Sequence, residues 1–130
     1  MTDGIEVNGI DQIFSKFDRV TAFDTLEPPM QRGVLRMQNY MQDYPPAPAH
    51  SHYIRTGTLG RRWTTQIDRS SDGLIGRIGN NTSYGPWVQS AAFQRRIFAR
   101  IGWHTDEQGV DTLRVEIVAD FQAAVNEAIK

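Results

Sequence analysis

Apolar residues in the first third of the chain recur every three or four positions, which is the spacing of one helical face. The first set is Ile10, Ile13, Phe14, Phe17 and Val20. The second set has the same spacing and is Met30, Val34, Met37, Met41 and Tyr44. Between the two sets, Pro28-Pro29 either ends one helix and starts another or kinks a single helix. The pattern therefore predicts an N-terminal amphipathic helix that is broken or kinked at the prolines.

The C-terminal segment carries the clearer helical pattern. Thr105-Asp106-Glu107-Gln108 resembles a capping box, in which the first and last side chains each accept the other residue's backbone N–H. The apolar stripe that follows is Val110, Leu113, Ile117, Phe121, Ala124 and Ala128. Acidic residues in the first turn and Lys130 at the end suit the helix dipole. We expect a helix of roughly 20–25 residues that packs across the sheet beside the N-terminal helix.

Strand patterns lie at the start and in the middle of the chain. Ile5-Glu6-Val7-Asn8-Gly9 alternates apolar and polar residues and ends in Asn-Gly, which predicts a short strand and a turn. Leu59–Ile67 and Leu74–Ile78 predict two further strands, and the polar segment Asp68–Gly73 joins them as the turn of a hairpin.

The remaining segments lack a regular pattern. Tyr44–Thr58 contains Pro45, Pro46 and Pro48 and predicts an irregular loop of about fifteen residues, a length that is usually functional or without fixed structure. Further along the chain we expect a turn at Asn80–Ser83, a short aromatic strand or loop at Tyr84–Val88, and irregular or briefly helical structure at Ser90–Ile101.

Together these elements predict an α+β fold. A small antiparallel β-sheet packs against an N-terminal helix and a long C-terminal helix, and a long proline-rich loop leaves the sheet. The chain has 130 residues, which suits one domain spanning 1–130. It has no cysteine, no apolar run long enough to cross a membrane and no signal-peptide pattern at its start. We therefore expect no disulfide, no thiol chemistry and no membrane partner.

Charge is distributed in three blocks, although the net charge is only −1. Residues 1–52 carry a net −3, residues 53–103 carry a net +6 from eight arginines, and residues 104–130 carry a net −4. A basic centre between acidic ends can pair within the fold or with a neighbouring copy. Arginine outnumbers lysine twelve to two, which favours planar interface contacts or reflects codon usage alone.

Residue patterns that would indicate catalysis or metal binding are weak. His50-Ser51-His52 needs a third ligand such as His104 to hold a metal, and two solvated loop histidines are the more ordinary interpretation. The acids at 106, 107 and 111 are explained by a helix N-terminus. The serines lie in turn-like contexts, none within G-x-S-x-G, and the glycine-containing segments match no phosphate loop. We therefore expect neither an enzyme nor a cofactor.

Nucleic-acid binding has more support, because arginines and aromatic residues alternate through the middle of the chain. The set comprises Arg55, Arg61, Arg62, Arg69, Arg77, Arg95, Arg96 and Arg100 with Tyr53, Trp63, Tyr84, Trp87 and Trp103. The isoelectric point near 6.3 argues against it. On a strand over 59–67, Arg61 and Trp63 would share one face and Arg62 would point to the other. We expect Trp87 and Trp103 to be core residues, with an interaction surface as the alternative.

Three motifs occur in order along the chain. They are Pro45-Pro46-Ala47-Pro48 leading to Tyr53-x-Arg55-Thr56-Gly57-Thr58-Leu59-x-Arg61-x-Trp63, then Asn80-x-x-x-Tyr84-x-Pro86-x-Val88-Gln89, then Gly102-Trp103 before the last helix. In these motifs the chain resembles the tail-completion and head–tail joining (neck) proteins of long-tailed bacteriophages. The resemblance covers nearly the whole chain. Gly85 and Trp87 depart from the alanine and tyrosine that are commoner beside this proline.

The resemblance implies a structural virion protein rather than an enzyme. Such a protein is assembled in the host cytoplasm and lies at the head–tail junction, where it forms a ring with copies of itself and contacts neck, connector or tail-tube proteins. The residues expected at the subunit or partner interface are Tyr53, Arg55, Thr56, Thr58, Arg61, Arg62, Tyr84 and Trp87. The residues expected to meet packaged DNA without reading its sequence are Arg69, Arg77, Arg95 and Arg96. The alternative is a nucleic-acid-binding module built on the central arginines and aromatics.

Overall fold

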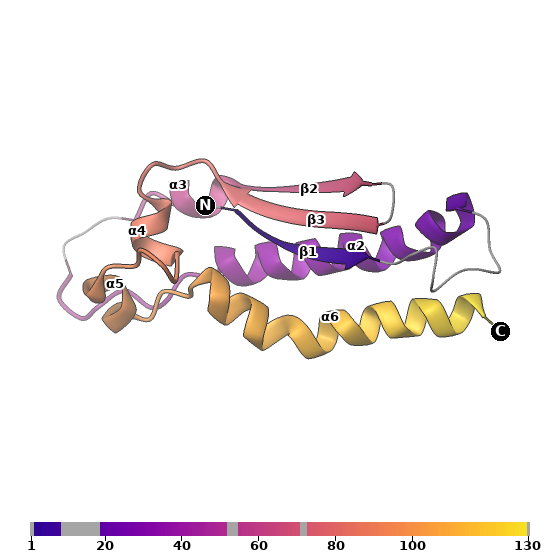
Figure 1. The fold of residues 1–130 in the computed structure, drawn as a ribbon. Helices are drawn as coiled ribbons and strands as arrows, with labels where there is room; N and C mark the ends of the chain where they lie inside the picture. Colours follow the sequence, from indigo (N-terminus) through magenta and orange to yellow (C-terminus); the bar gives the residue numbers. More distant parts are fainter. Residues whose placement is uncertain (1, 9–18, 52–54, 71–72, 130) are drawn as a thin grey trace.

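Three antiparallel strands form the sheet of this α+β protein. The computed structural model describes residues 2–8, 19–51, 55–70 and 73–129. The strands are β1 (Thr2–Asn8), β2 (Trp63–Arg69) and β3 (Gly73–Asn80), in the order β1-β3-β2. The predicted hairpin and N-terminal strand are therefore confirmed, and β3 lies in the centre (Figure 1). The register places Ile5 and Ile67 on either side of Gly76.

Helix α2 (Arg19–Gln42) runs without a break through Pro28 and Pro29. A helix end at the prolines, one of the two outcomes that the sequence allows, is thus wrong. Pro29 is almost completely buried, and α2 packs against all three strands. This burial offsets the helix hydrogen bonds that the prolines cannot make. Residues 10–17, which carry most of the first predicted helical set, lie outside the described residues.

The main core lies between α2 and the sheet. Met30, Val34, Met37 and Met41 are buried, as their spacing predicts. They meet β3 at Gly76, where an added Cβ would lie 2.5 Å from Met30 Sδ and 2.7 Å from Val34 Cγ1. The closeness of these contacts explains why a glycine occupies the middle of a central strand.

Helix α6 (Asp106–Ala128) confirms the predicted C-terminal helix. The capping box is present: Gln108 N–H donates to Thr105 Oγ1 at 3.2 Å, and Thr105 N–H donates to Gln108 Oε1 at 2.9 Å. Ile117 is buried against the core, and the rest of the predicted stripe is partly buried.

The partner of α6 is chiefly α2 rather than the sheet, which corrects the expected packing across the strands (Figure 1). Gly33 of α2 faces both β1 and α6: an added Cβ would clash with Ile5 Cδ1 at 2.7 Å and would make an ordinary contact with Ile117 Cγ2 at 3.6 Å. On the outside of this helix pair, Arg36 bridges Glu116 at 2.9 Å and Asp120 at 3.0 Å.

Three short helices gather at the end of the molecule where β2 begins (Figure 1). They are α3 (Thr58–Arg61), α4 (Gly85–Gln89) and α5 (Arg96–Ile101). They surround a second core cluster of Leu59, Val88 and Trp103.

Two of these short helices correct predictions, and the third confirms one. The strand expected from Leu59 begins only at Trp63, because Gly57 takes a left-handed conformation (φ 78°) and the chain then makes one helical turn. The predicted strand or loop at Tyr84–Val88 is a helix, and Pro86 lies in its first turn, where proline suits a helix. The briefly helical structure that the sequence allows at Ser90–Ile101 is present as α5.

Candidate interaction surface

Arg55, an expected interface residue, is held within the fold. Its guanidinium donates a hydrogen bond to the Pro45 carbonyl oxygen. The same group lies 5.1 Å from the ring centroid of Trp103 and 5.7 Å from that of Tyr44, and these two rings are 4.7 Å apart. Arg55 therefore joins both ends of the proline-rich loop to the second core cluster, so its first role is structural.

The next expected interface residues close a small loop. Thr56 and Thr58 share a hydrogen bond of 2.8 Å between their hydroxyls, and Arg61 Nη1 donates to the Thr56 carbonyl at 3.0 Å. Arg61 and Arg62 are both exposed, and because they lie in and just after α3 the predicted split across a strand does not apply. Tyr53 lies outside the described residues.

Arg69 and Arg77, expected near DNA, are paired with acids instead. Arg77 Nη1 lies 2.8 Å from Asp68 Oδ2. Arg69 Nε lies 2.5 Å from Glu27 Oε1, and its guanidinium covers the Phe23 ring at 4.9 Å. The hydrogen bond from Arg69 holds the pKa of Glu27 below its ordinary value.

The four expected DNA contacts do not share one surface. Arg69 ends β2 beside the hairpin turn, whereas Arg95 and Arg96 lie at α5, at the opposite end of the molecule (Figure 1). Arg95 and Arg96 are exposed and, unlike Arg69 and Arg77, have no ion-pair partner among the described residues. The sequence could not separate the two pairs, because their distance depends on how the hairpin is oriented relative to the short helices.

Large apolar side chains are exposed around α4 and α5. The exposed fractions are 45% for Trp87, 59% for Phe93 and 60% for Ile97. Trp87 and Phe93 meet edge to face with centroids 6.2 Å apart, and the Arg95 guanidinium lies 5.2 Å from the Trp87 centroid. We name as the α4–α5 surface the residues Tyr84, Trp87, Phe93, Arg95, Arg96 and Ile97. The core prediction is therefore confirmed for Trp103, which is 9% exposed, and wrong for Trp87.

Polar side chains of Gln89, Gln94 and Asp106 fix the backbone beneath this surface. Gln89 is fully buried and donates to the Met41 carbonyl at 2.9 Å, which ties α4 to α2. Gln94 donates to the Val88 carbonyl at 2.7 Å and to the Trp103 carbonyl at 3.1 Å. Asp106 accepts the Ala91 N–H at 2.9 Å. The exposed aromatics thus stand on a well-supported scaffold.

Sequence reasoning did not select Phe93, Ile97 or the two glutamines. Phe93 and Ile97 belong to a segment without helical or strand periodicity, so no sequence pattern predicted that their side chains are exposed. The available signal was the presence of three large apolar residues, Phe93, Ile97 and Phe98, among the three arginines between Phe93 and Arg100.

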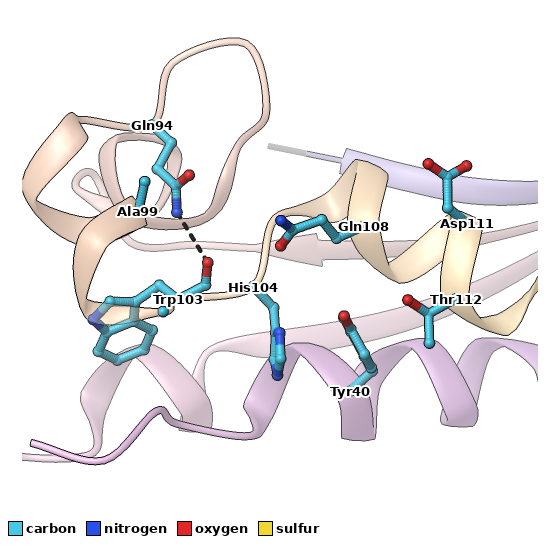
Figure 2. A pocket seen from close by; sticks show the side chains of 9 residues that line it. Tyr40, Gln94, Ala99, Trp103, His104, Gln108, Asp111 and Thr112 are labelled. Carbon is cyan, nitrogen blue, oxygen red and sulfur yellow. Dashed lines mark hydrogen bonds between the residues drawn. The ribbon is translucent and has the colours of Figure 1, made fainter.

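A polar groove of about 440 Å³ lies between α2, the start of α6 and the segment before it (Figure 2). His104 stacks on Tyr40 with centroids 4.2 Å apart, and Asp111 and Thr112 line the α6 side. His104 Nε2 lies 3.8 Å from Asp43 Oδ2, beyond hydrogen-bond distance. The groove brings together polar groups that can accept a partner's side chain, but no nucleophile bonded to a base lines it.

A second groove of about 500 Å³ lies on another side of the start of α6. It is lined by Ser90, Ala91, Ala92, Asp106, Glu107, Val110, Asp111 and Arg114. Asp111 lines both grooves. Acids therefore outnumber bases three to one in the second groove, above small apolar residues.

In the part of the chain that the structure describes, no three His, Cys, Asp or Glu side chains are grouped to hold a metal, and no helix is long and apolar enough to span a membrane. His50 is exposed, and His52 lies outside the described residues.

Comparisons of the chain with models of protein families, with curated proteins and with solved structures found no match.

Proposed function

We propose that this chain is a structural virion protein of a long-tailed bacteriophage. It acts at the head–tail junction, where it completes the tail or joins it to the DNA-filled capsid. In this role it forms a ring with copies of itself and contacts connector or tail-tube proteins. It is assembled in the host cytoplasm and has no catalytic task.

The observation that carries this proposal is the α4–α5 surface. Exposed Trp and Phe side chains beside Arg are the residue types that dominate the energetics of protein–protein interfaces. Here Trp87 and Phe93 are about half exposed, and buried and part-buried hydrogen bonds from Gln89 and Gln94 fix the segment that presents them. An assembly subunit needs such a rigid surface to bury against a neighbour. The three sequence motifs add the phage neck as the place of assembly.

Nucleic-acid binding is the second candidate, and Trp87 with Arg95 is the observation that favours it. Stacking surfaces beside a guanidinium can hold single-stranded nucleic acid. The rest of the basic centre contributes less, because Arg69 and Arg77 are paired with acids and Arg55 is bound to the Pro45 carbonyl. Passive contact of Arg95 and Arg96 with packaged DNA is compatible with the first proposal.

Deletion of the gene in its phage, followed by electron microscopy of the lysate, tests the proposal. We expect filled heads and separate tails to accumulate, and expression of the chain from a plasmid to restore joined particles. Normal infectious particles without the chain would refute the role. A DNA gel shift at several salt concentrations tests the second candidate, which predicts tight binding that weakens steeply as salt rises.

A further inference from the structure

The end of the molecule that carries the α4–α5 surface also carries a surface of opposite charge. This second surface, which we name the acidic groove, consists of Ala91, Ala92, Glu107, Val110 and Asp111. Glu107 and Asp111 are exposed, and among the described residues neither has an ion-pair partner. Asp106 is excluded from the set because it caps the Ala91 and Glu107 N–H groups.

Basic side chains at the α4–α5 surface also have no ion-pair partner in the described part of the chain. Arg96 and the neighbouring Arg100 are exposed, and neither has an ion-pair partner in the described part of the chain. Arg36, Arg69 and Arg77, by contrast, are paired with acids of the same chain. Charged side chains of both signs without an ion-pair partner in the described residues therefore occur at this end of the molecule.

The two surfaces also match in polarity. The α4–α5 surface exposes large apolar side chains at Trp87, Phe93 and Ile97, and their burial against apolar groups is favourable. The acidic groove, of about 500 Å³, is lined by the small apolar residues Ala91 and Ala92 together with acids. One surface thus supplies large apolar groups and cations, and the other supplies small apolar groups and anions.

We propose that the α4–α5 surface of one copy docks into the acidic groove of the next copy. The proposal deepens the proposed function, because it names the contact between subunits of the ring. The contact joins two different surfaces, so it can repeat head to tail, and it then closes a ring when the rotation per subunit allows it. In this contact Arg96 faces Asp111 or Glu107 of the neighbour, while the aromatic side chains cover the alanines. Arg114 at the groove rim is the one base that opposes the incoming cations.

Cysteine cross-linking tests the contact, and the natural chain contains no cysteine to interfere. Two single variants, Ile97→Cys and Ala92→Cys, are purified separately and mixed at high concentration, and in a second setting they are co-expressed in phage-infected cells. Under oxidising conditions we expect a disulfide-linked dimer of the two variants in the mixture and little product from either variant alone. A dimer from Ile97→Cys alone would show that the surface pairs with itself and would overturn the proposal. No mixed dimer in either setting would overturn it as well.

Charge reversal tests the same contact independently of the cysteines. Within the mixed cross-linking assay, Arg96→Glu or Asp111→Arg alone should lower the yield by about tenfold or more, because each places like charges together. Arg96→Glu in one copy with Asp111→Arg in the other should restore the yield to within about twofold of the unchanged pair. If the single charge reversals lower the yield of the mixed dimer and the combined reversals do not restore it, the charge pairing is overturned. Circular dichroism confirms that each variant is folded.

The outcomes separate the contact from the role at the neck. Cross-linking of the purified chain together with normal particles from the deletion phage would leave the contact standing and remove the neck role. Defective particles from the deletion phage, together with no mixed dimer, would remove the contact and leave the neck role standing.

Discussion

Replacement of Arg55 by alanine distinguishes a structural arginine from an interface arginine. The sequence motifs place this residue at a subunit interface, whereas the structure shows its guanidinium against Trp103, Tyr44 and the Pro45 carbonyl. The change removes all three contacts at once and leaves the Pro45 carbonyl to find another donor. We therefore expect Arg55→Ala to destabilise the folded monomer.

The size of the effect follows from these contacts. A guanidinium near an aromatic face contributes about 0.5–1 kcal/mol when it is partly solvated. A hydrogen bond from a charged donor contributes about 1.5–3 kcal/mol. Because Arg55 is half-buried and the contacts share one side chain, we expect a total of about 2–3 kcal/mol rather than the full sum.

Urea unfolding followed by tryptophan fluorescence measures this loss. With an m-value of about 2 kcal/mol/M, the midpoint should fall by about 1–1.5 M. Arg62→Ala is the matched control, because Arg62 is exposed and should change stability by less than about 0.5 kcal/mol. Arg55→Lys keeps the charge but loses the planar group, so its midpoint should lie between those of the wild type and Arg55→Ala. An unchanged midpoint for Arg55→Ala, with assembly lost, would refute the structural role and support the interface role.

Three further changes test the packing, the capping and the electrostatics. Ile117→Ala should cost about 2–5 kcal/mol in urea unfolding because it opens a cavity between α6 and α2, whereas Val115→Ala, at a side chain 78% exposed, should cost less than about 0.5 kcal/mol. Thr105→Ala should cost about 1 kcal/mol, because the first turn of α6 loses its side-chain acceptor, and a cost near zero would show that the capping box is dispensable. Glu27→Gln tests pH dependence: the bond from Arg69 lowers the folded pKa of Glu27, so its stabilisation is present above the ordinary pKa of 4.5 and is lost as pH falls through the folded value. The stability difference between wild type and Glu27→Gln should therefore shrink on acidification below about pH 4.5, and a difference that is constant with pH would contradict the pairing.

Long-range periodicity made the main elements of the fold predictable. The apolar residues of Met30–Met41 and of Val110–Ala128 each lie on one helical face, and that face packs against the core. Their spacing in the sequence therefore predicted both helices, and the capping-box motif predicted the cap at Thr105. The course of the chain at Pro28 was harder to predict, because local proline chemistry favours a break. The helix is continuous because Pro29 and Met30 are buried in the core, and this burial outweighs the local preference of proline.

The candidate surface was only partly predictable. Trp87 was named both as core and as interface, since an aromatic residue in a short irregular segment has no periodicity that assigns its direction. The start of β2 was misplaced because the left-handed Gly57 and the Tyr44 hydroxyl, which accepts the Gly60 N–H at 2.8 Å, stabilise a helical turn over strand-forming residues. The pairing of Arg69 with Glu27 joins residues 42 positions apart and depends on tertiary structure alone.

We propose that the α4–α5 surface joins this chain to its neighbours in the phage neck. Complementation of the gene-deleted phage by a folded Trp87→Ala/Phe93→Ala variant, scored as joined particles by electron microscopy, is the sharpest test of this role. Val118→Ala, at a side chain as exposed as Phe93, is the control and should restore joined particles fully. With the aromatic variant we expect separate heads and tails. Joined, infectious particles at the wild-type level would show that the surface is not needed at the neck.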